Sequence, residues 1–255
     1  MSNKDTYEAQ GVVKSYSAQN DLQKPEETIL NILKNKAGNM RMLDIGVGGG
    51  RTTLYFAGLV KEYIGIDYSE NMIKACRMRF SNCLENMSFE VCDAKAMEIF
   101  KDDYFDFILF SFNGIDYISH EDRLKALQEI KRVGKKGGFF CFSTHNLRSV
   151  DKLLAVKLSV NPAKMLYFIL QHLLLRFMNR GLRKLRNEPY AIIRDGAYRF
   201  RLATYYVKPE MAAKQLSDLG YRNIRVYSLT NGEEVSDKSE LETIIDPWLY
   251  YLCNI

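Results

Sequence analysis

The segment Leu43-Asp44-Ile45-Gly46-Val47-Gly48-Gly49-Gly50-Arg51 joins a short apolar strand to a glycine-rich turn. Glycines at such a turn let backbone N–H groups approach a ligand, and a helix is expected directly afterwards, at 52–59. Asp67 lies 21 residues beyond Gly46, at the tip of the next expected strand. A carboxylate there can accept hydrogen bonds from both ribose hydroxyls of a nucleoside. The segment therefore predicts a nucleoside site in an α/β fold.

Two classes of nucleoside ligand compete for this turn. The dinucleotide fingerprint requires Gly or Ala where Arg51 stands, because the helix must pack closely on the sheet. Asp44 would also place a carboxylate near two phosphates. A sulfonium ligand with an amino-acid tail has the opposite preference, because its ammonium and sulfonium charges favour a nearby acid. The residues favour the sulfonium ligand, and an NAD-dependent enzyme is the disfavoured alternative.

Strand-like and helical patterns alternate from residue 42 to residue 144. After the first strand, strands are expected at 63–66, 87–91, 105–111 and 139–143, with helices at 70–80 and 121–133. Strands separated by helices imply right-handed crossovers and a parallel sheet. The pattern then predicts helices from 148 to about 200, at 150–160 and 163–186, before strands at 202–207, 224–229 and 248–253 and a helix at 209–219.

Five ordered motifs resemble those of the class I S-adenosylmethionine (SAM) dependent methyltransferases. They are Asp44-x-Gly46-x-Gly48-x-Gly50, Gly65-Ile66-Asp67-Tyr68-Ser69, Val91-Cys92-Asp93-Ala94, the fourth strand ending at Ser111, and the lysine–glycine turn from Lys131 to Gly138. The resemblance implies a Rossmann-like, doubly wound, seven-stranded, mostly parallel sheet with one antiparallel strand. A helical insertion would lie between the fifth and sixth strands.

This interpretation divides the chain into three parts. Residues 1–40 form an N-terminal helical segment that covers the cofactor site. Residues 41–147 and 202–255 form the Rossmann-like core, and residues 148–201 form a basic helical insertion.

The resemblance also implies that SAM is the cofactor, that S-adenosylhomocysteine is the product, and which residues bind SAM. The amides around Gly46 and Gly48 would hold the methionine part, and Asp44 would orient the loop or the ammonium group. Asp67 would bind the ribose, and Asp93 would accept from the adenine amine. The other expected cofactor-binding residues are Tyr16, Tyr68, Met72, Ala94 and Ser111.

On the acceptor side, residues after the fourth strand face the methyl group in this family. Asn113 and Asp116 are the polar candidates there. His145, just after the fifth strand, is the preferred general base, which helps only if the nucleophile must lose a proton. Its alternative role is a strand-end histidine bonded to the backbone. His120 and His172 are expected at a helix start and in packing, and none of the three has metal-ligand spacing, so no metal is expected.

The insertion carries an unusual share of charge. Residues 148–201 hold 12 Lys/Arg and three Asp/Glu, a net charge of +9. The rest of the chain holds 24 Lys/Arg and 28 Asp/Glu, a net charge of −4. Basic residues 176, 180, 183 and 184 fall on one helical stripe, with leucines roughly opposite. Four roles stay open: a lid or dimer surface, recognition of an anionic small acceptor, peripheral contact of 163–186 with a membrane, and, least favoured, nucleic acid.

Composition agrees with a globular protein. The 255 residues are 47% hydrophobic and 26% charged, the first 25 residues lack the apolar core of a secretory signal, and no apolar run is long enough to span a bilayer. The five cysteines (76, 83, 92, 141 and 253) show no C-x-x-C spacing and indicate reduced core residues. A cytoplasmic location is expected.

These observations predict a SAM-dependent methyltransferase that acts on a small molecule by direct displacement. A SAM-binding sensor or partner protein without transferase activity is the alternative from another class. A membrane-associated or nucleic-acid acceptor is the further alternative.

Overall fold

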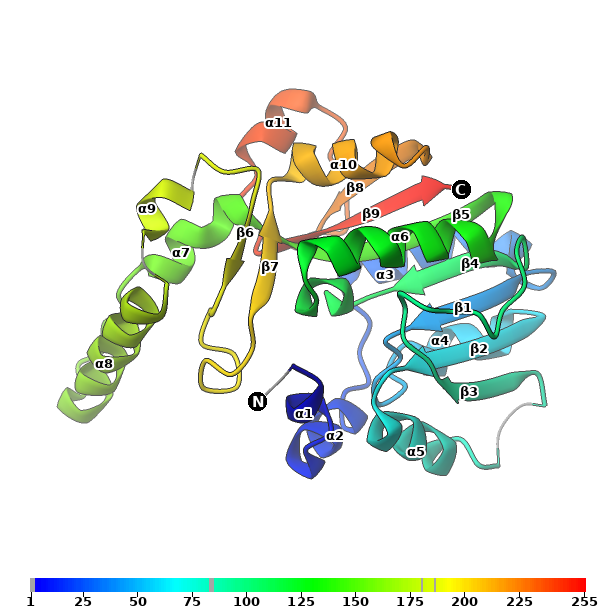
Figure 1. Ribbon diagram of the computed structural model, residues 1–255, viewed down its shortest axis with the longest axis horizontal. Coiled ribbons are helices and arrows are strands. Elements are labelled where there is room, and N and C mark those ends of the chain that lie inside the picture. The colour runs from blue at the N-terminus through cyan, green and yellow to red at the C-terminus, as the bar shows by residue number, and fades with distance from the viewer. Residues whose placement is uncertain (1–2, 83–84, 180, 186) are drawn as a thin grey trace.

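The computed structural model describes residues 3–82, 85–179, 181–185 and 187–255, and its centre is one mixed sheet (Figure 1). Seven strands follow the order β3-β2-β1-β4-β5-β9-β8, and β9 alone runs antiparallel to its neighbours. Their bounds are β1 Arg41–Ile45, β2 Glu62–Asp67, β3 Met87–Val91, β4 Phe105–Phe110, β5 Gly134–Asn146, β8 Arg222–Ser228 and β9 Trp248–Asn254. The expected fold class is confirmed, but β5 is longer than the predicted 139–143, because it already begins at Gly134 in the expected lysine–glycine turn.

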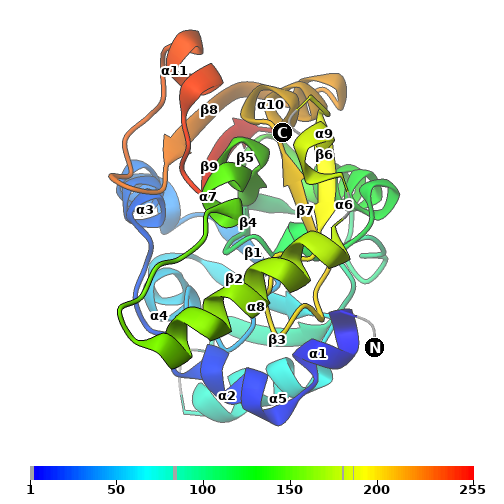
Figure 2. The ribbon, with the colours of Figure 1, turned by 90° about the vertical axis from the view of Figure 1, so that its left-hand side faces the viewer.

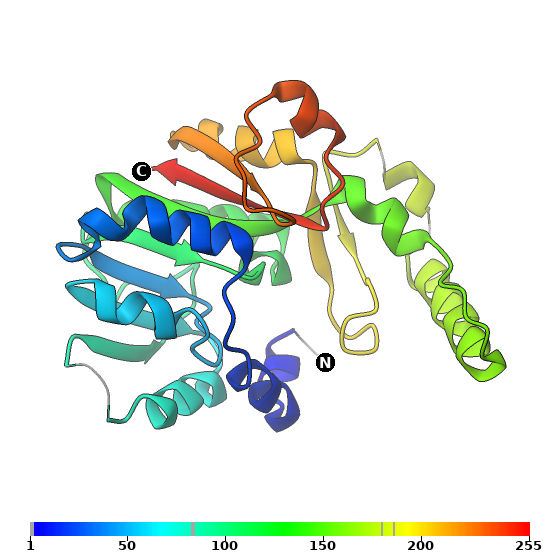
Figure 3. The same ribbon diagram turned by 180° about the vertical axis from the view of Figure 1, so that it is seen from behind.

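Helices cover both faces of this sheet, because alternate residues of each central strand point into two separate cores. On one face, Phe105, Ile108 and Phe140 pack with apolar residues of α6 and α10. On the other face, Phe107 and Leu109 pack with residues of α3, α4 and α5, and Figure 3 shows α3 and α4 on that side. These helices are α3 Lys24–Ala37, α4 Thr53–Phe56, α5 Glu70–Arg79, α6 His120–Val133 and α10 Pro209–Asp218.

The N-terminal helices α1 Asn3–Tyr7 and α2 Gln10–Ser17 lie beside the carboxyl ends of the parallel strands (Figure 1). Glu8, in the connection between them, accepts hydrogen bonds from the backbone amides of Glu70 and Asn71 at the start of α5. Asn3 donates to the carbonyls of Tyr117 and Ala203, at 2.7 Å and 3.2 Å. The N-terminal segment is therefore fastened to both sides of that edge.

The insertion departs from the expected run of helices. The helix expected at 150–160 ends early, since α7 is Val150–Leu154, and the one expected at 163–186 is α8 Pro162–Met178 followed by a separate α9 Leu182–Leu185. Gly181, with φ +81°, separates the two. Residue 180 of the expected basic stripe lies outside the described residues, and so does Cys83.

Two further strands, β6 Tyr190–Ile193 and β7 Thr204–Val207, form an antiparallel hairpin on the end of β5. The prediction of helix through residue 200 was wrong at β6. Its alternation buries Ala191 and Ile193 and exposes Ile192, which is a strand pattern too short to stand out in a basic segment. The remaining elements are the 3₁₀ turns Ala57–Leu59, Gly114–Tyr117 and Leu147–Ser149, and α11 Lys238–Thr243.

Two observations concern membrane-spanning helices and the state of the cysteines. Within the described ranges no helix has the length and apolar character needed to cross a membrane. Cys76, Cys141 and Cys253 are buried free thiols, and Cys92 is half-buried.

Candidate active site

A cavity of about 740 Å³, including its open mouth, lies at the carboxyl ends of the parallel strands. This is the edge at which open α/β sheets bind ligands. Nine of the ten expected cofactor-binding residues line it together with Tyr7, Phe112 and Tyr117: Tyr16, Gly46, Gly48, Asp67, Tyr68, Met72, Asp93, Ala94 and Ser111. The tenth, Asp44, lines an adjoining hollow with Gly46 and Thr52.

The glycine turn has the backbone that its sequence requires. Gly46, Gly48 and Gly50 have φ of +64°, +55° and +79°, a region in which only glycine is at ease. At Gly49 a Cβ would stand 2.4 Å from the backbone nitrogen of Ser17, so the end of α2 sits directly on the turn. The turn is therefore both a ligand cradle and the seat of the N-terminal segment.

Two buried carboxylates flank the turn without a cation against them. Asp67 accepts from the amides of Gly48 at 3.1 Å and Ser69 at 2.9 Å, and burial raises its pKa to about 6. One oxygen of Asp44 accepts from Thr52 and from Tyr63 at 2.6 Å, and burial raises its pKa to about 6 as well. Each carboxylate keeps free lone pairs, so both can still accept hydrogen bonds from a ligand.

The third strand supplies the opposite wall of the cavity. Asp93 is exposed and accepts from the amide of Lys95 at 3.1 Å, which fixes the turn after β3. Met72, buried at the start of α5, packs in a cluster with Tyr7 and Leu202. This wall therefore combines the exposed carboxylate of Asp93 with the apolar side chain of Met72.

Tyrosine rings from distant segments close over the cavity. Tyr7 has ring contacts with Tyr16, Tyr68, Tyr117 and Tyr198, with centroids 5.5 to 6.4 Å apart. Burial raises the pKa of Tyr7 and Tyr16 well above the ordinary value, so both stay neutral hydroxyls. The sequence singled out Tyr16 but missed Tyr7, because a tyrosine in a short polar helix has no pattern of its own.

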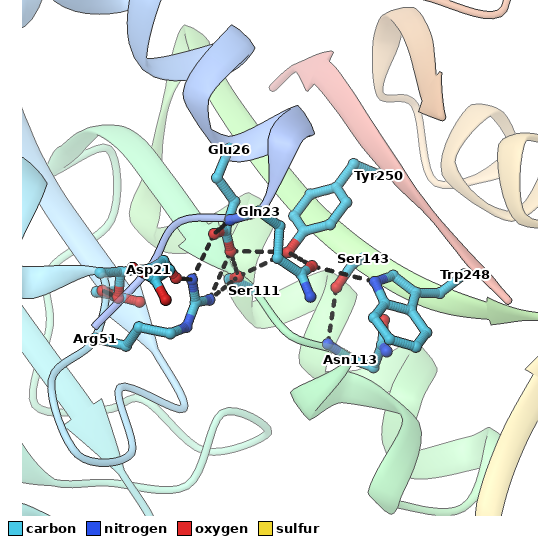
Figure 4. A network of polar contacts seen from close by, with 11 residues as sticks. Asp21, Gln23, Glu26, Arg51, Ser111, Asn113, Ser143, Trp248 and Tyr250 are labelled. Atoms are coloured by element: carbon cyan, nitrogen blue, oxygen red, sulfur yellow. Dashed lines mark hydrogen bonds and ion pairs between the residues drawn. The ribbon is translucent and has the colours of Figure 1, made fainter. Parts of the chain in front are cut away.

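A buried polar network holds the turn to the rest of the molecule (Figure 4). Arg51 forms a two-pronged ion pair with Glu26 of α3, at 2.5 Å and 2.6 Å. Burial alone would raise the pKa of Glu26, but the hydrogen bonds and charge of Arg51 hold it below its usual range. Tyr250 of β9 donates to Glu26 at 2.8 Å. The glycine turn, α3 and β9 therefore meet at one carboxylate, that of Glu26.

This network changes the interpretation of Ser111. Its hydroxyl bonds to Glu26 and accepts from Arg51 at 3.0 Å, so it serves the network as well as lining the cavity. Glu26 itself was missed from the sequence. Its signal in the sequence was a capping box, Gln23-x-x-Glu26, with Pro25 between the two residues. In the structure, Glu26 accepts a hydrogen bond from the amide of Gln23 at 2.7 Å at the start of α3.

A second buried network surrounds Asp116. One carboxylate oxygen accepts from Arg123 at 2.7 Å and Thr144 at 2.6 Å. The other accepts from the backbone amide of His145 at 2.7 Å and faces its Nδ1 at 2.8 Å. Asp116, which was expected among the residues facing the methyl group, is fully buried and is absent from the cavity lining. Its four lone-pair sites are filled, and it acts on His145 instead.

Asp116 fixes the proton of His145. A carboxylate already paired with Arg123 can only accept, so Nδ1 must carry the hydrogen and Nε2 keeps its lone pair; this tautomer is assigned from the hydrogen bonds. Rings of Tyr206, Trp248 and Tyr117 surround the imidazole, with centroids 4.8, 5.9 and 6.4 Å away. His145 does not line the cavity directly, but its side chain keeps 11% of its surface exposed.

Asn113 does not fit its expected place either. It is buried, has φ +61°, and its backbone amide donates to Ser143 at 2.7 Å. Its side chain is absent from the cavity lining, and Oδ1 has no partner among the described residues. Phe112 and Asn113 both have positive φ, a strained conformation for residues other than glycine. This backbone turns the chain sharply after β4 and places Phe112 in the cavity lining.

The other histidines have packing roles. His120 stacks on Tyr190 with centroids 4.2 Å apart, and its Nδ1 lies 2.9 Å from the Tyr205 hydroxyl. In the part of the chain that the structure describes, no group of three or more His, Cys, Asp or Glu side chains is placed to hold a metal ion.

Comparison with known proteins agrees with this geometry. A family model described as a methyltransferase domain matches residues 42–138. These residues match a methyltransferase domain, and the chain has the class I SAM-dependent methyltransferase fold. An uncharacterised methyltransferase of Bacillus subtilis is 36% identical over 108 residues, which are 41% of this chain and 40% of that protein. The matches span about half the length, or less, of the curated relatives.

Solved structures of the family share the fold. A SAM-dependent methyltransferase from Mesorhizobium loti superposes with a TM-score of 0.60 at 14% identity, over 91% of this chain and 98% of that one. A phosphoethanolamine N-methyltransferase from Haemonchus contortus, solved with SAM, has a TM-score of 0.63 at 17% identity and covers 100% of this chain and 60% of that one. SAM is the methyl donor of these two enzymes. Asp44 and Asp67, which have no cation in direct contact, offer acceptor oxygens of the kind that an ammonium group and ribose hydroxyls require.

Cofactor affinity should depend on pH and on Asp67. Charge-assisted hydrogen bonds are about twice as strong as neutral ones, so the affinity for S-adenosylhomocysteine should fall as pH drops below about 6 and protonates Asp44 and Asp67. Asp67→Asn should weaken binding roughly 10- to 100-fold at pH 7.5 and flatten the pH dependence. Titration calorimetry from pH 5.5 to 7.5 measures both. Unchanged affinity in Asp67→Asn, with the exposed Asp103→Asn as control, would contradict this assignment.

The same groups contribute to the pH dependence of the stability of the unliganded protein. Asp44 and Asp67 have folded pKa values of about 6, above the ordinary value near 3.9. Their contribution to stability is therefore fully present below about pH 4 and is lost as pH rises through 6.

Breaking the buried pair should destabilise the fold strongly. Glu26→Ala leaves Arg51 buried without a counter-charge, and such losses cost about 3–5 kcal/mol. Urea unfolding measures this. The matched control is Glu27→Ala on the same helix, which removes an exposed ion pair with Lys24 at 3.3 Å and should cost less than about 1 kcal/mol. Equal losses in the two variants would show that the network contributes little.

Proposed function

We propose that this chain transfers a methyl group from SAM to a small-molecule acceptor, with His145 as the general base. The observation that carries the proposal is the junction of two sites. The cavity lined by the glycine turn, Asp67 and Asp93 meets, at Tyr117 and Phe112, the aromatic surroundings of an imidazole whose tautomer is fixed.

The cofactor residues have separate tasks in this proposal. The amides of the glycine turn hold the carboxylate of the methionine part, and Asp44 accepts from its ammonium group. Asp67 accepts from the ribose hydroxyls. Asp93 and the backbone at Ala94 bind the adenine edge, with Met72 and Tyr68 on its faces. When bound, SAM supplies a methyl group on a positively charged sulfur, and the displacement needs alignment more than any metal.

His145 takes up the proton that the acceptor hydroxyl loses. The acceptor hydroxyl transfers its proton to Nε2 as the new oxygen–carbon bond forms and the carbon–sulfur bond breaks. Asp116 stabilises the resulting imidazolium from the Nδ1 side, and Arg123 holds Asp116 in place. A base contributes only where a proton must leave, so its presence favours an acceptor with an ionisable hydroxyl.

The surroundings of His145 favour a flat, apolar acceptor. Tyr117, Tyr206 and Trp248 present ring surfaces within 6.4 Å of the imidazole. Aromatic walls of this kind bind planar ligands well. The phosphoethanolamine enzyme among the structural neighbours acts on a small acceptor, which agrees with the size proposed here, although its likeness to this chain is one of fold.

The test is formation of S-adenosylhomocysteine from SAM with a panel of small phenols, amines and carboxylic acids. Turnover is expected with a phenolic acceptor. His145→Ala should lower kcat by about 10²- to 10⁴-fold while leaving the affinity for S-adenosylhomocysteine unchanged. His172→Ala, a histidine on α8, is the matched control and should keep full activity. Cofactor binding without turnover on any acceptor would favour a non-catalytic SAM-binding protein, and full activity of His145→Ala would leave that histidine structural.

A further inference from the structure

Helix α8 exposes its large apolar side chains to solvent, which is the reverse of the usual arrangement in a globular protein. Eight large apolar side chains on its outer surface are exposed: Leu166, Tyr167, Ile169, Leu170, Leu173, Leu174, Phe177 and Met178. At 100° per residue they form one continuous face covering about half the helix circumference. Leu175 is the one side chain of α8 classed as buried among the described residues. The side that faces the protein includes the half-buried polar residues Gln171 and His172, which line a hollow against Asp195 and Gly196.

The exposed apolar face continues into the segment that leads to α8. Val156, Leu158 and Val160 are exposed, Leu158 by 80%. The helix also extends away from the sheet in Figures 1 and 3, and in Figure 2 it crosses the front of the molecule with its outer side uncovered. Contiguous apolar surface of this kind marks a docking site rather than scattered surface residues.

The charges around this face are of one sign. Lys152, Lys157, Lys164 and Arg176 are exposed, and no Asp or Glu occurs in the sequence from 152 to 187. Lys164 and Arg176 lie at the two margins of the apolar face, about 160° and 280° around the helix from Leu166. An apolar face with basic margins complements a surface that is both apolar and anionic.

A second copy of this chain fits the face less well. In a symmetric contact through α8, Lys164 and Arg176 of one copy would approach the same cations of the other with no acid on either helix to compensate. An anionic bilayer supplies the missing negative charge and takes the apolar side chains among its acyl chains. At 17 residues, α8 is too short to span the bilayer but long enough to lie along it.

We propose that the outer face of α8 docks on the surface of an anionic lipid bilayer. The helix lies in the plane of the interface, with Leu166, Leu170 and Phe177 inserted between lipids and with Lys164 and Arg176 among the headgroups. This proposal does not rest on the proposed function, because it concerns binding to lipid and not the transfer reaction.

Co-sedimentation with vesicles tests it. The full chain should bind phosphatidylcholine vesicles that contain about one-third phosphatidylglycerol, and should bind pure phosphatidylcholine at least about tenfold more weakly. Raising salt from about 0.05 M to 0.5 M should reduce binding to the anionic vesicles by a similar factor. Leu170→Glu/Phe177→Glu should abolish binding, and Lys164→Glu/Arg176→Glu should weaken it at least tenfold.

Two controls keep the result interpretable. Met78→Glu/Ile99→Glu adds the same two negative charges on side chains outside α8 that are 78% and 61% exposed, and this variant should bind vesicles as the parent does. Circular dichroism of all variants should match the parent, since every replaced side chain is exposed. Absence of binding to anionic vesicles at low salt, or binding that survives Leu170→Glu/Phe177→Glu, would overturn the proposal. Self-association that this variant abolishes, without any vesicle binding, would assign the face to a second copy instead.

Discussion

The ion pair between Arg51 and Glu26 is the constraint on which the cofactor edge depends. The guanidinium stands at the end of the glycine turn, and the carboxylate stands in the first turn of α3, so the pair fixes the N-terminal segment against the sheet. Ser111 after β4 and Tyr250 of β9 complete the same network. Desolvating two charges is expensive, so the pair is stable only while every partner is present. That dependence makes the turn rigid and lets α2 rest directly on Gly49.

The buried acids of this edge fall into two kinds. Glu26 and Asp116 each have an arginine against them, and all their oxygens serve the protein. Asp44 and Asp67 have no cation in contact, and burial raises the pKa of both. Two buried carboxylates without a direct ion pair leave a favourable place for a cationic or hydroxyl-rich ligand. The acids that serve the protein are therefore separate from the acids that keep free lone pairs, and this edge favours a positively charged sulfonium nucleoside over a pyrophosphate.

Much of this could be predicted from the sequence, because motifs with a backbone requirement are local. Gly46 and Gly48 need positive φ, Asp67 ends a strand, and the alternation of strands and helices fixes the core. Long-range partners could not be predicted in this way. Asp116 follows β4 as expected, but its burial depends on Arg123, Thr144 and His145, which only the folded chain brings together. Strand β6 was missed because a four-residue strand carries too little periodicity, although its partner β7 was expected at 202–207. The outward apolar face of α8 can be recognised only once the side of the helix that faces the protein is known.

The measurement that tests the central claim most directly is the thermal shift of the wild-type chain with S-adenosylhomocysteine and, separately, with NAD. At 100 times its dissociation constant, a ligand stabilises the folded state by about 2.7 kcal/mol. For a chain of this size, that should raise the melting temperature by roughly 5–10 °C. The account predicts this shift with S-adenosylhomocysteine and none with NAD. A shift with NAD alone would contradict it, because the glycine turn would then hold a pyrophosphate beside Asp44.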